Sequence, residues 1–203
     1  MGNKTSPRDA ADLRIRKMTY AAMFLSIAMV LPLIILQIPE IGKMLSPMHI
    51  PVLLCGFMCG WPWGLAVGLI APPLRSVIFG MPAMFPEAVA MAFELAAYGA
   101  VSGLLYRMLP RRKWAVYASL LAAMIIGRLV WGLVRLFLAG VSGSAFTAAM
   151  FLGGAVTGAV PGIIMHIVLI PVLVMLMERE GLVLGRPAPE SGKERRKAAE
   201  EKN

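Results

Sequence analysis

Charged residues are scarce in this sequence, and long stretches have almost none. Only 15% of the 203 residues are Asp, Glu, Lys or Arg, and nearly all of these lie before Met18, between Arg107 and Lys113, or after Met177. The stretches between them contain apolar runs of about 20 residues, the length that spans a bilayer as a helix. This distribution excludes a soluble globular domain and predicts a protein embedded in the membrane.

The sequence has only two cysteines, Cys55 and Cys59, and they lie in an apolar segment. Their i,i+4 spacing is not that of a CxxC redox motif, and two residues do not complete a metal site. We interpret them as small buried residues, and we expect no metal and no other cofactor in this chain.

Motifs for enzymatic chemistry are also missing. The chain has no Walker A sequence, no HExxH and no DxD-type carboxylate cluster, so no motif for ATP hydrolysis is present. The segment Gly140-Val141-Ser142-Gly143 resembles the GxSG of intramembrane serine proteases, with His166 as a candidate base. Ser142 is expected in an outer loop and His166 about 20 residues into the next helix, a separation of roughly 30 Å. We therefore predict that the chain is not an enzyme.

The apolar segments of the sequence predict an all-α integral membrane protein of about six transmembrane helices. The predicted spans are, in order, 19–38, 48–59, 60–79 after a turn at 60–63, 87–106, 114–138 and 146–177. The second is short for a full crossing, and the sixth contains Pro161 and Pro171, so we expect it to be kinked or tilted. Between spans, Gly80 to Pro86 breaks the helix and Ala139 to Ser144 forms a loop.

The formal charge of +9 belongs to the flanks of these spans. Lys and Arg at the ends of apolar spans mark the cytoplasmic side, so both termini and the 107–113 loop are expected in the cytoplasm. We predict a basic cytoplasmic N-terminus at 1–18, a six-helix membrane domain at 19–177 and a charged cytoplasmic tail at 178–203. This explanation of the basic charge argues against nucleic acid as a partner.

Glycines recur at every fourth position in several spans, a pattern that lets membrane helices approach closely. They are Gly56, Gly60, Gly64 and Gly68, then Gly99 and Gly103, then Gly154, Gly158 and Gly162. The pattern fits packing within the chain, and the alternative is an interface with a partner.

Ionisable residues inside the spans are costly and usually face a partner, a cavity or a ligand. They are Arg75, Glu94, Arg128, Arg135 and His166. Arg128, Trp131 and Arg135 share one helix face by their spacing, and Glu94 shares a face with Tyr98. If their helices are neighbours, Glu94 and Arg128 form either a structural ion pair or a pair of ligand contacts.

Arg135 is the better candidate for a ligand contact, because it lies nearer the predicted outer end of its span. With Arg75 it gives the outer half a cationic excess that Glu94 and Glu87 only partly offset. We therefore predict an anionic or carboxylate-bearing substrate.

Three further residues leave alternatives open. His49, where the outer loop enters the second span, caps a helix or contacts the ligand. Trp131 is a stacking wall for the ligand or an ordinary packing residue. His166, deep in the sixth span, is a packing histidine or a site residue, and we interpret it as a packing histidine.

Three stretches carry a family resemblance: Leu45-Ser-Pro-Met-His-Ile-Pro-Val-Leu-Leu-Cys-Gly-Phe, Gly60-Trp-Pro-Trp-Gly-Leu-Ala-Val-Gly-Leu and Met91-Ala-Phe-Glu-Leu-Ala-Ala-Tyr-Gly. They resemble the substrate-specific S components of energy-coupling factor (ECF) transporters, over roughly Met18 to Met177. The resemblance implies a six-helix subunit of the bacterial cell membrane that binds a vitamin or vitamin precursor near the outer face. It also implies a coupling subunit and two ATPase subunits as partners, which use the ATP.

The resemblance carries residues over by location. The implied pocket, built from the outer loops and later helices, contains His49, Arg75, Glu94, Tyr98, Arg128, Trp131 and Arg135. The family's first helix presents an AxxxA face to the coupling subunit, and the nearest match here is Ala22 with Ser26, preceded by Ala21. Pantothenate is the first substrate expected, and a queuosine or thiamine precursor comes next.

A self-sufficient membrane protein, either a small channel or an intramembrane enzyme, is the alternative function. Dependence of uptake on coexpressed partner subunits distinguishes the importer from these alternatives.

Overall fold

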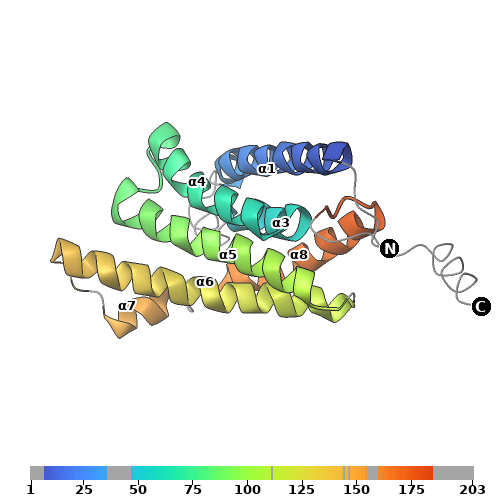
Figure 1. Cartoon of the computed structure of the whole chain (residues 1–203). Helices are drawn as coiled ribbons and strands as arrows, with labels where there is room; N and C mark the ends of the chain where they lie inside the picture. Colours follow the sequence, from blue (N-terminus) through green and yellow to red (C-terminus); the bar gives the residue numbers. More distant parts are fainter. Residues whose placement is uncertain are drawn as a thin grey trace, which may run out of the picture.

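The computed structural model describes residues 7–35, 47–110, 112–143, 145, 147–154 and 160–184. Within these residues every regular element is a helix (Figure 1). In chain order they are α1 (Pro7–Ile35), α3 (His49–Cys59), α4 (Trp61–Phe79), the π-helix η1 (Met84–Ala88), α5 (Val89–Met108), α6 (Lys113–Ser142), α7 (Ala148–Leu152) and α8 (Val160–Arg179). Among the described residues, five segments are long and apolar enough to cross a membrane: α1, α4, η1 with α5, α6, and α8. The predicted all-α membrane fold is therefore confirmed.

The short second span is the helix α3, which lies in the middle of the bundle. Its 11 residues extend about 16 Å, roughly half the thickness of the hydrocarbon core. All of them are buried, and α3 contacts α1, α4, α5 and α8. A helix that is apolar on all sides is stable only when other elements surround it. The position of α3 carries its first residue, His49, into the interior of the protein.

Glycines allow α3, α4 and α5 to pack with their backbones in contact. A Cβ atom on Gly64 would lie 2.6 Å from the carbonyl oxygen of Gly99, and one on Gly103 would lie 2.5 Å from the carbonyl oxygen of Gly56. No side chain fits at these distances. The interpretation that these glycines serve packing within the chain is confirmed.

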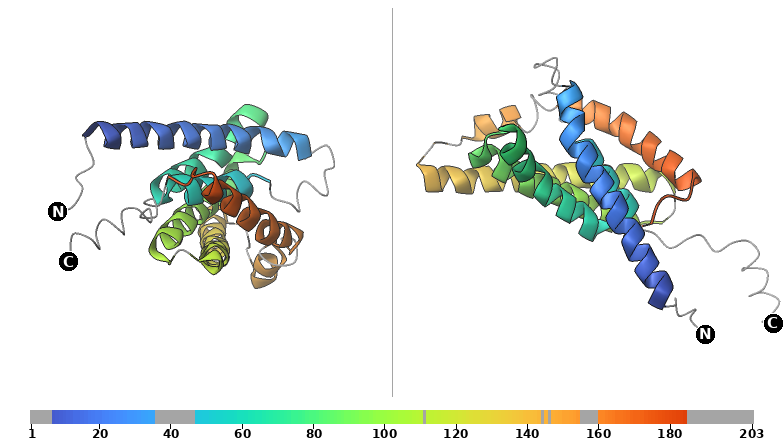
Figure 2. Two further views of the ribbon diagram at one scale, coloured as in Figure 1. Left: turned by 90° about the vertical axis from the view of Figure 1, so that its right-hand side faces the viewer. Right: turned by 90° about the horizontal axis from the view of Figure 1, so that it is seen from above.

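The helix α1 lies on one side of the layer formed by α3, α4 and α5, and α6 lies on the other (Figure 1). Seen from above, α1 crosses the bundle obliquely (Figure 2). Its 29 residues extend about 43 Å, which exceeds the hydrocarbon thickness of about 30 Å. The basic segment from Pro7 onward is thus helical and continuous with the first span.

Several predicted boundaries are wrong. The helix α4 begins at Trp61, inside the turn expected at 60–63, and η1 begins at Met84, inside the break expected from Gly80 to Pro86. The helix α6 continues through Ser142, where a loop from Ala139 was expected, and it ends at Gly143, whose φ of 67° suits glycine. In place of one long sixth span the structure has two helices, α7 and α8. Residues 155–159, which that prediction also covered, lie outside the described residues.

Candidate substrate-binding site

The carboxylate of Glu94 is the centre of a polar cluster to which three helices contribute. Its Oε1 atom lies 3.0 Å from Nη1 of Arg128 and 3.6 Å from Nε2 of His49, and it accepts a 3.0 Å hydrogen bond from the hydroxyl of Tyr98. Glu94 and Tyr98 come from α5, Arg128 from α6 and His49 from α3. Four of the residues predicted for the pocket are therefore brought together.

The close approach of α5 and α6 at this level depends on Gly127. A Cβ atom on Gly127 would collide with the ring of Tyr98, so glycine lets this ring pack against the backbone of α6. The next residue, Arg128, then reaches the Glu94 carboxylate. The Glu94–Arg128 ion pair, one of the two alternatives left open by the sequence, is formed; whether these residues also contact a ligand stays a prediction.

The two charges of this pair differ in their exposure. The Glu94 side chain is 2% exposed and the Arg128 side chain is 21% exposed. Pairing lowers the high cost of placing either charge alone in the membrane interior. The enclosed member of the pair is therefore Glu94, and the member with an exposed part is Arg128.

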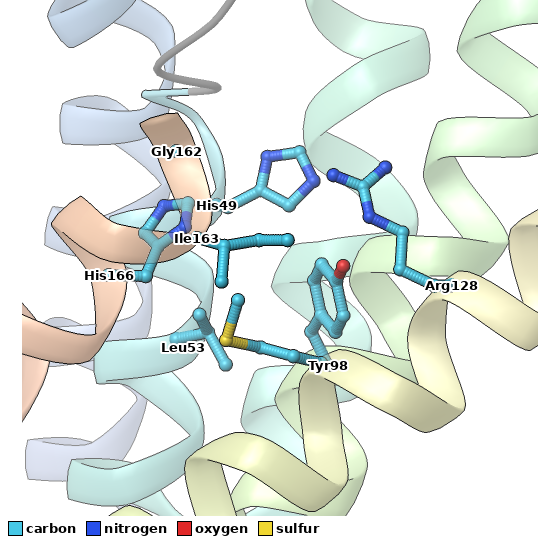
Figure 3. A pocket seen from close by; sticks show the side chains of 8 residues that line it. His49, Leu53, Tyr98, Arg128, Gly162, Ile163 and His166 are labelled. Carbon is cyan, nitrogen blue, oxygen red and sulfur yellow. The ribbon is translucent and has the colours of Figure 1, made fainter. Parts of the chain in front are cut away.

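A cavity of about 250 Å³, including its opening, lies next to the cluster. The residues that line it are His49, Leu53, Tyr98, Met124, Arg128, Gly162, Ile163 and His166. Figure 3 shows the polar ends of His49, Tyr98 and Arg128 near one another, with Leu53 farther from them. Apolar walls with a few converging polar groups are typical of small-molecule sites.

The sequence analysis assigned His166 to packing, whereas the structure places its side chain in this cavity. The imidazole lies with its ring centroid 5.9 Å from that of His49, and the residue is only 5% exposed. A signal was present in the sequence: His166 lies one turn after Gly162, so the two share a face of α8. That face lines the cavity.

Arg135 and Trp131 do not line this cavity. Nη1 of Arg135 lies 2.6 Å from Oε1 of Glu87 in η1, and the guanidinium lies 5.9 Å from the ring centroid of Trp131. Trp131 in turn stacks on Phe151 of α7 at a centroid distance of 6.2 Å. In the structure these two residues connect α6 to η1 and α7, and a role for them in ligand binding remains a prediction.

Arg75 also lies outside the cavity lining. It is 3% exposed, its Nη1 donates a 2.8 Å hydrogen bond to the carbonyl oxygen of Met29, and its guanidinium lies 5.3 Å from the ring centroid of Phe79. Met29 precedes Pro32, which lacks an N–H group and disturbs the hydrogen bonding of the turn before it. Arg75 thus attaches α4 to α1 near this proline.

The residues predicted to dock a partner divide between two faces of α1. Ala22 and Ser26 are exposed, and the Ser26 hydroxyl donates a 3.0 Å hydrogen bond to the carbonyl oxygen of Ala22. Ala21 is only 5% exposed and belongs to the core. The face open to a partner therefore contains Ala22 and Ser26, while Ala21 packs within the chain.

The serine and histidine considered for an enzyme have different surroundings. Ser142 donates a 2.8 Å hydrogen bond to the carbonyl oxygen of Leu138 near the end of α6, whereas His166 lines the cavity, which Ser142 does not. In the part of the chain that the structure describes, no group of three or more His, Cys, Asp or Glu residues is arranged to hold a metal ion.

The sequence was compared with known families, proteins and structures. A family profile described as "ECF transporter, substrate-specific component" matches residues 16–174. No curated protein and no solved structure matches the chain. The matched range contains every residue of the cavity lining. Proteins of this family are transport subunits rather than enzymes, and they take a small-molecule substrate in partnership with an ECF module. The chain is a multi-pass cell-membrane protein that belongs to the substrate-specific components of ECF transporters.

Proposed function

We propose that this chain captures a vitamin or vitamin precursor with an anionic group at the outer face of the membrane. The cavity next to Glu94 and Arg128 is the binding site, and pantothenate is the first compound to test. A transmembrane coupling subunit and two ATPase subunits then drive uptake, and they rather than this chain use ATP.

The observation that carries this proposal is the open position of Arg128. A guanidinium has five N–H donors in a planar fork that suits a carboxylate. One Arg128 nitrogen faces Glu94 at 3.0 Å, and the side chain lines the cavity. The remaining donors can bind a ligand carboxylate without a change in the protein's own ion pair. The other two candidate arginines, Arg75 and Arg135, point to partners outside the cavity lining.

The test is ligand binding by the purified subunit, first by native mass spectrometry and then by thermal-shift titration against a vitamin panel. Arg128→Gln should weaken binding of an anionic vitamin by about ten- to a hundredfold, because a hydrogen bond to a charged group contributes about 1.5–3 kcal/mol. Arg135→Gln is the matched control and should bind as the wild type does.

The variant Arg128→Gln leaves the Glu94 carboxylate buried without its cation, which can impair folding. A double variant, Glu94→Gln with Arg128→Gln, removes both charges and tests the same contact. The double variant is compared with Glu94→Gln alone, since both lack the Glu94 charge. Equal binding of an anionic vitamin by these two folded variants would refute the role of Arg128. Loss of binding in Arg135→Gln alone would place the site at the other end of the Arg128 to Arg135 face.

Uptake in cells tests the transport part of the proposal. Accumulation of the bound vitamin should require coexpression of the coupling and ATPase subunits. Uptake by this chain alone would instead support a self-sufficient channel.

A further inference from the structure

The side chain of His166 is buried without full hydrogen bonding. The residue is 95% buried, since its exposure is 5%, and its Nε2 atom has no hydrogen-bond partner among the described residues. A buried polar group without a partner is destabilising, and the membrane interior offers it little water as a replacement. A histidine that serves only to fill space would be replaced at lower cost by leucine or methionine.

The direction of the side chain suggests what the missing partner is. His166 lines the same cavity as Arg128, and Figure 3 shows the two side chains on opposite sides of it, carried by α8 and α6. Ile163 and Leu53 lie between and below them. A molecule in the cavity would therefore meet a cation at one end, apolar side chains along its length, and the imidazole at the other end.

We propose that His166 is a specificity-determining residue, which hydrogen-bonds a hydroxyl or amide group of a substrate whose anionic group is held at Arg128. This inference rests on the proposed function, because it assumes that the cavity is the substrate site. It adds the second recognition element: the substrate has an uncharged polar group in addition to its anionic group.

The lining residues favour an uncharged group at the His166 end. Among the described residues of the lining, the ionisable side chains besides His166 are His49, Tyr98 and Arg128, and Glu94 lies 3.0 Å from Arg128. No second arginine or lysine is present in the described lining to balance a second anionic group. A hydroxyl or amide satisfies an imidazole nitrogen without the cost of burying another charge.

Three probes separate the two recognition elements. Pantothenate has a carboxylate together with hydroxyl and amide groups, panthenol replaces the carboxylate with an alcohol, and octanoate has the carboxylate alone. Their affinities would be measured by isothermal titration on the purified full-length chain, as wild type, His166→Leu, His166→Asn and Val168→Leu. Val168→Leu is the matched control and should bind all three probes as the wild type does, because Val168 is exposed on the same helix, α8, and does not line the cavity.

His166→Leu should weaken pantothenate binding by about tenfold and leave octanoate binding unchanged, since octanoate has no group for the imidazole. His166→Asn should restore part of the loss because its amide can still form a hydrogen bond. Equal binding of pantothenate by His166→Leu and the wild type would overturn the inference, even if Arg128 proves essential. If instead panthenol binds as tightly as pantothenate and is weakened by His166→Leu, the role of His166 is supported and the anionic part of the proposed function fails.

A measurement without ligand decides the case in which none of the three probes binds. If the partner of His166 is a ligand, then the empty protein loses no contact in His166→Leu, and its melting temperature should equal or exceed that of the wild type. A decrease of several degrees would show that His166 stabilises the folded chain and would overturn the inference.

Discussion

Replacing Glu94 with glutamine tests which charge the substrate carries. The amide oxygen of glutamine can still accept hydrogen bonds from Tyr98 and Arg128, which both lie 3.0 Å from Oε1 in the wild type. The negative charge is lost, so the Arg128 charge is no longer balanced. An anionic ligand should then bind more tightly, whereas a cationic ligand should bind more weakly.

The size of the effect follows from the geometry. A ligand carboxylate on the same guanidinium would lie roughly 6 Å from the Glu94 carboxylate, and two like charges at that distance repel by about 3 kcal/mol at an effective dielectric constant of about 20. Removing this repulsion sets an upper limit of about a hundredfold on the gain in affinity, and we expect at least about tenfold. Without ligand the variant should be less stable by about 2–3 kcal/mol, the lower part of the range for breaking a buried pair, because Arg128 is 21% exposed.

Isothermal titration with pantothenate measures the affinity, and thermal unfolding in detergent measures the stability. Glu87→Gln is the control, since Glu87 pairs with Arg135 and does not line the cavity. Weaker pantothenate binding by Glu94→Gln would refute the reasoning, because it would show that the Glu94 carboxylate contributes to binding the ligand rather than opposing it. An unchanged affinity would place the substrate away from this ion pair.

Two further predictions concern packing and assembly. Gly99→Ala should lower the free energy of unfolding by about 1–3 kcal/mol, because its Cβ would collide with the backbone of α4; thermal unfolding checks this. Gly140→Ala, where a new Cβ would meet no atom within 4 Å, should cause no loss and serves as the control. Ala22→Leu adds bulk to the exposed face of α1 and should reduce copurification with the coupling subunit without changing vitamin affinity, and Val168→Leu on the exposed face of α8 should not. Normal assembly of Ala22→Leu would move the docking face elsewhere.

The sequence predicted a helix well where spanning the bilayer requires a long apolar run. The third span was expected to end near Phe79 and does so, because a membrane helix needs about 20 apolar residues and Gly80 stops it. One long sixth span was predicted because hydropathy measures only the apolar character of a segment, and the residues of α7 and of α8 are both apolar.

In the site, likewise, the sequence predicted which residues are polar and share a helix face, but not which distant residues they contact. Glu94, Tyr98 and Arg128 could be predicted because an ionisable residue in a membrane span needs a partner, and the pairing of residues on one helix face follows from spacing. The partners of Arg135 and Arg75 could not, since they lie 48 and 46 residues away in the chain. The sequence therefore overestimated the cationic excess that an anionic substrate would meet.

An empty binding site within a bilayer must keep its charges balanced without the substrate. Here Glu94 supplies that balance, since its Oε1 faces Arg128, Tyr98 and His49 at once. Under the proposed function, the carboxylate of the substrate competes with Glu94 for Arg128. Its net contribution to the binding free energy is the difference between its own contacts with Arg128 and those that Glu94 already provides. Charge alone would then discriminate weakly among anionic vitamins, because each would meet the same competition from Glu94. Selectivity must come from the uncharged part of the substrate, which is the part that would lie against Leu53, Ile163 and His166.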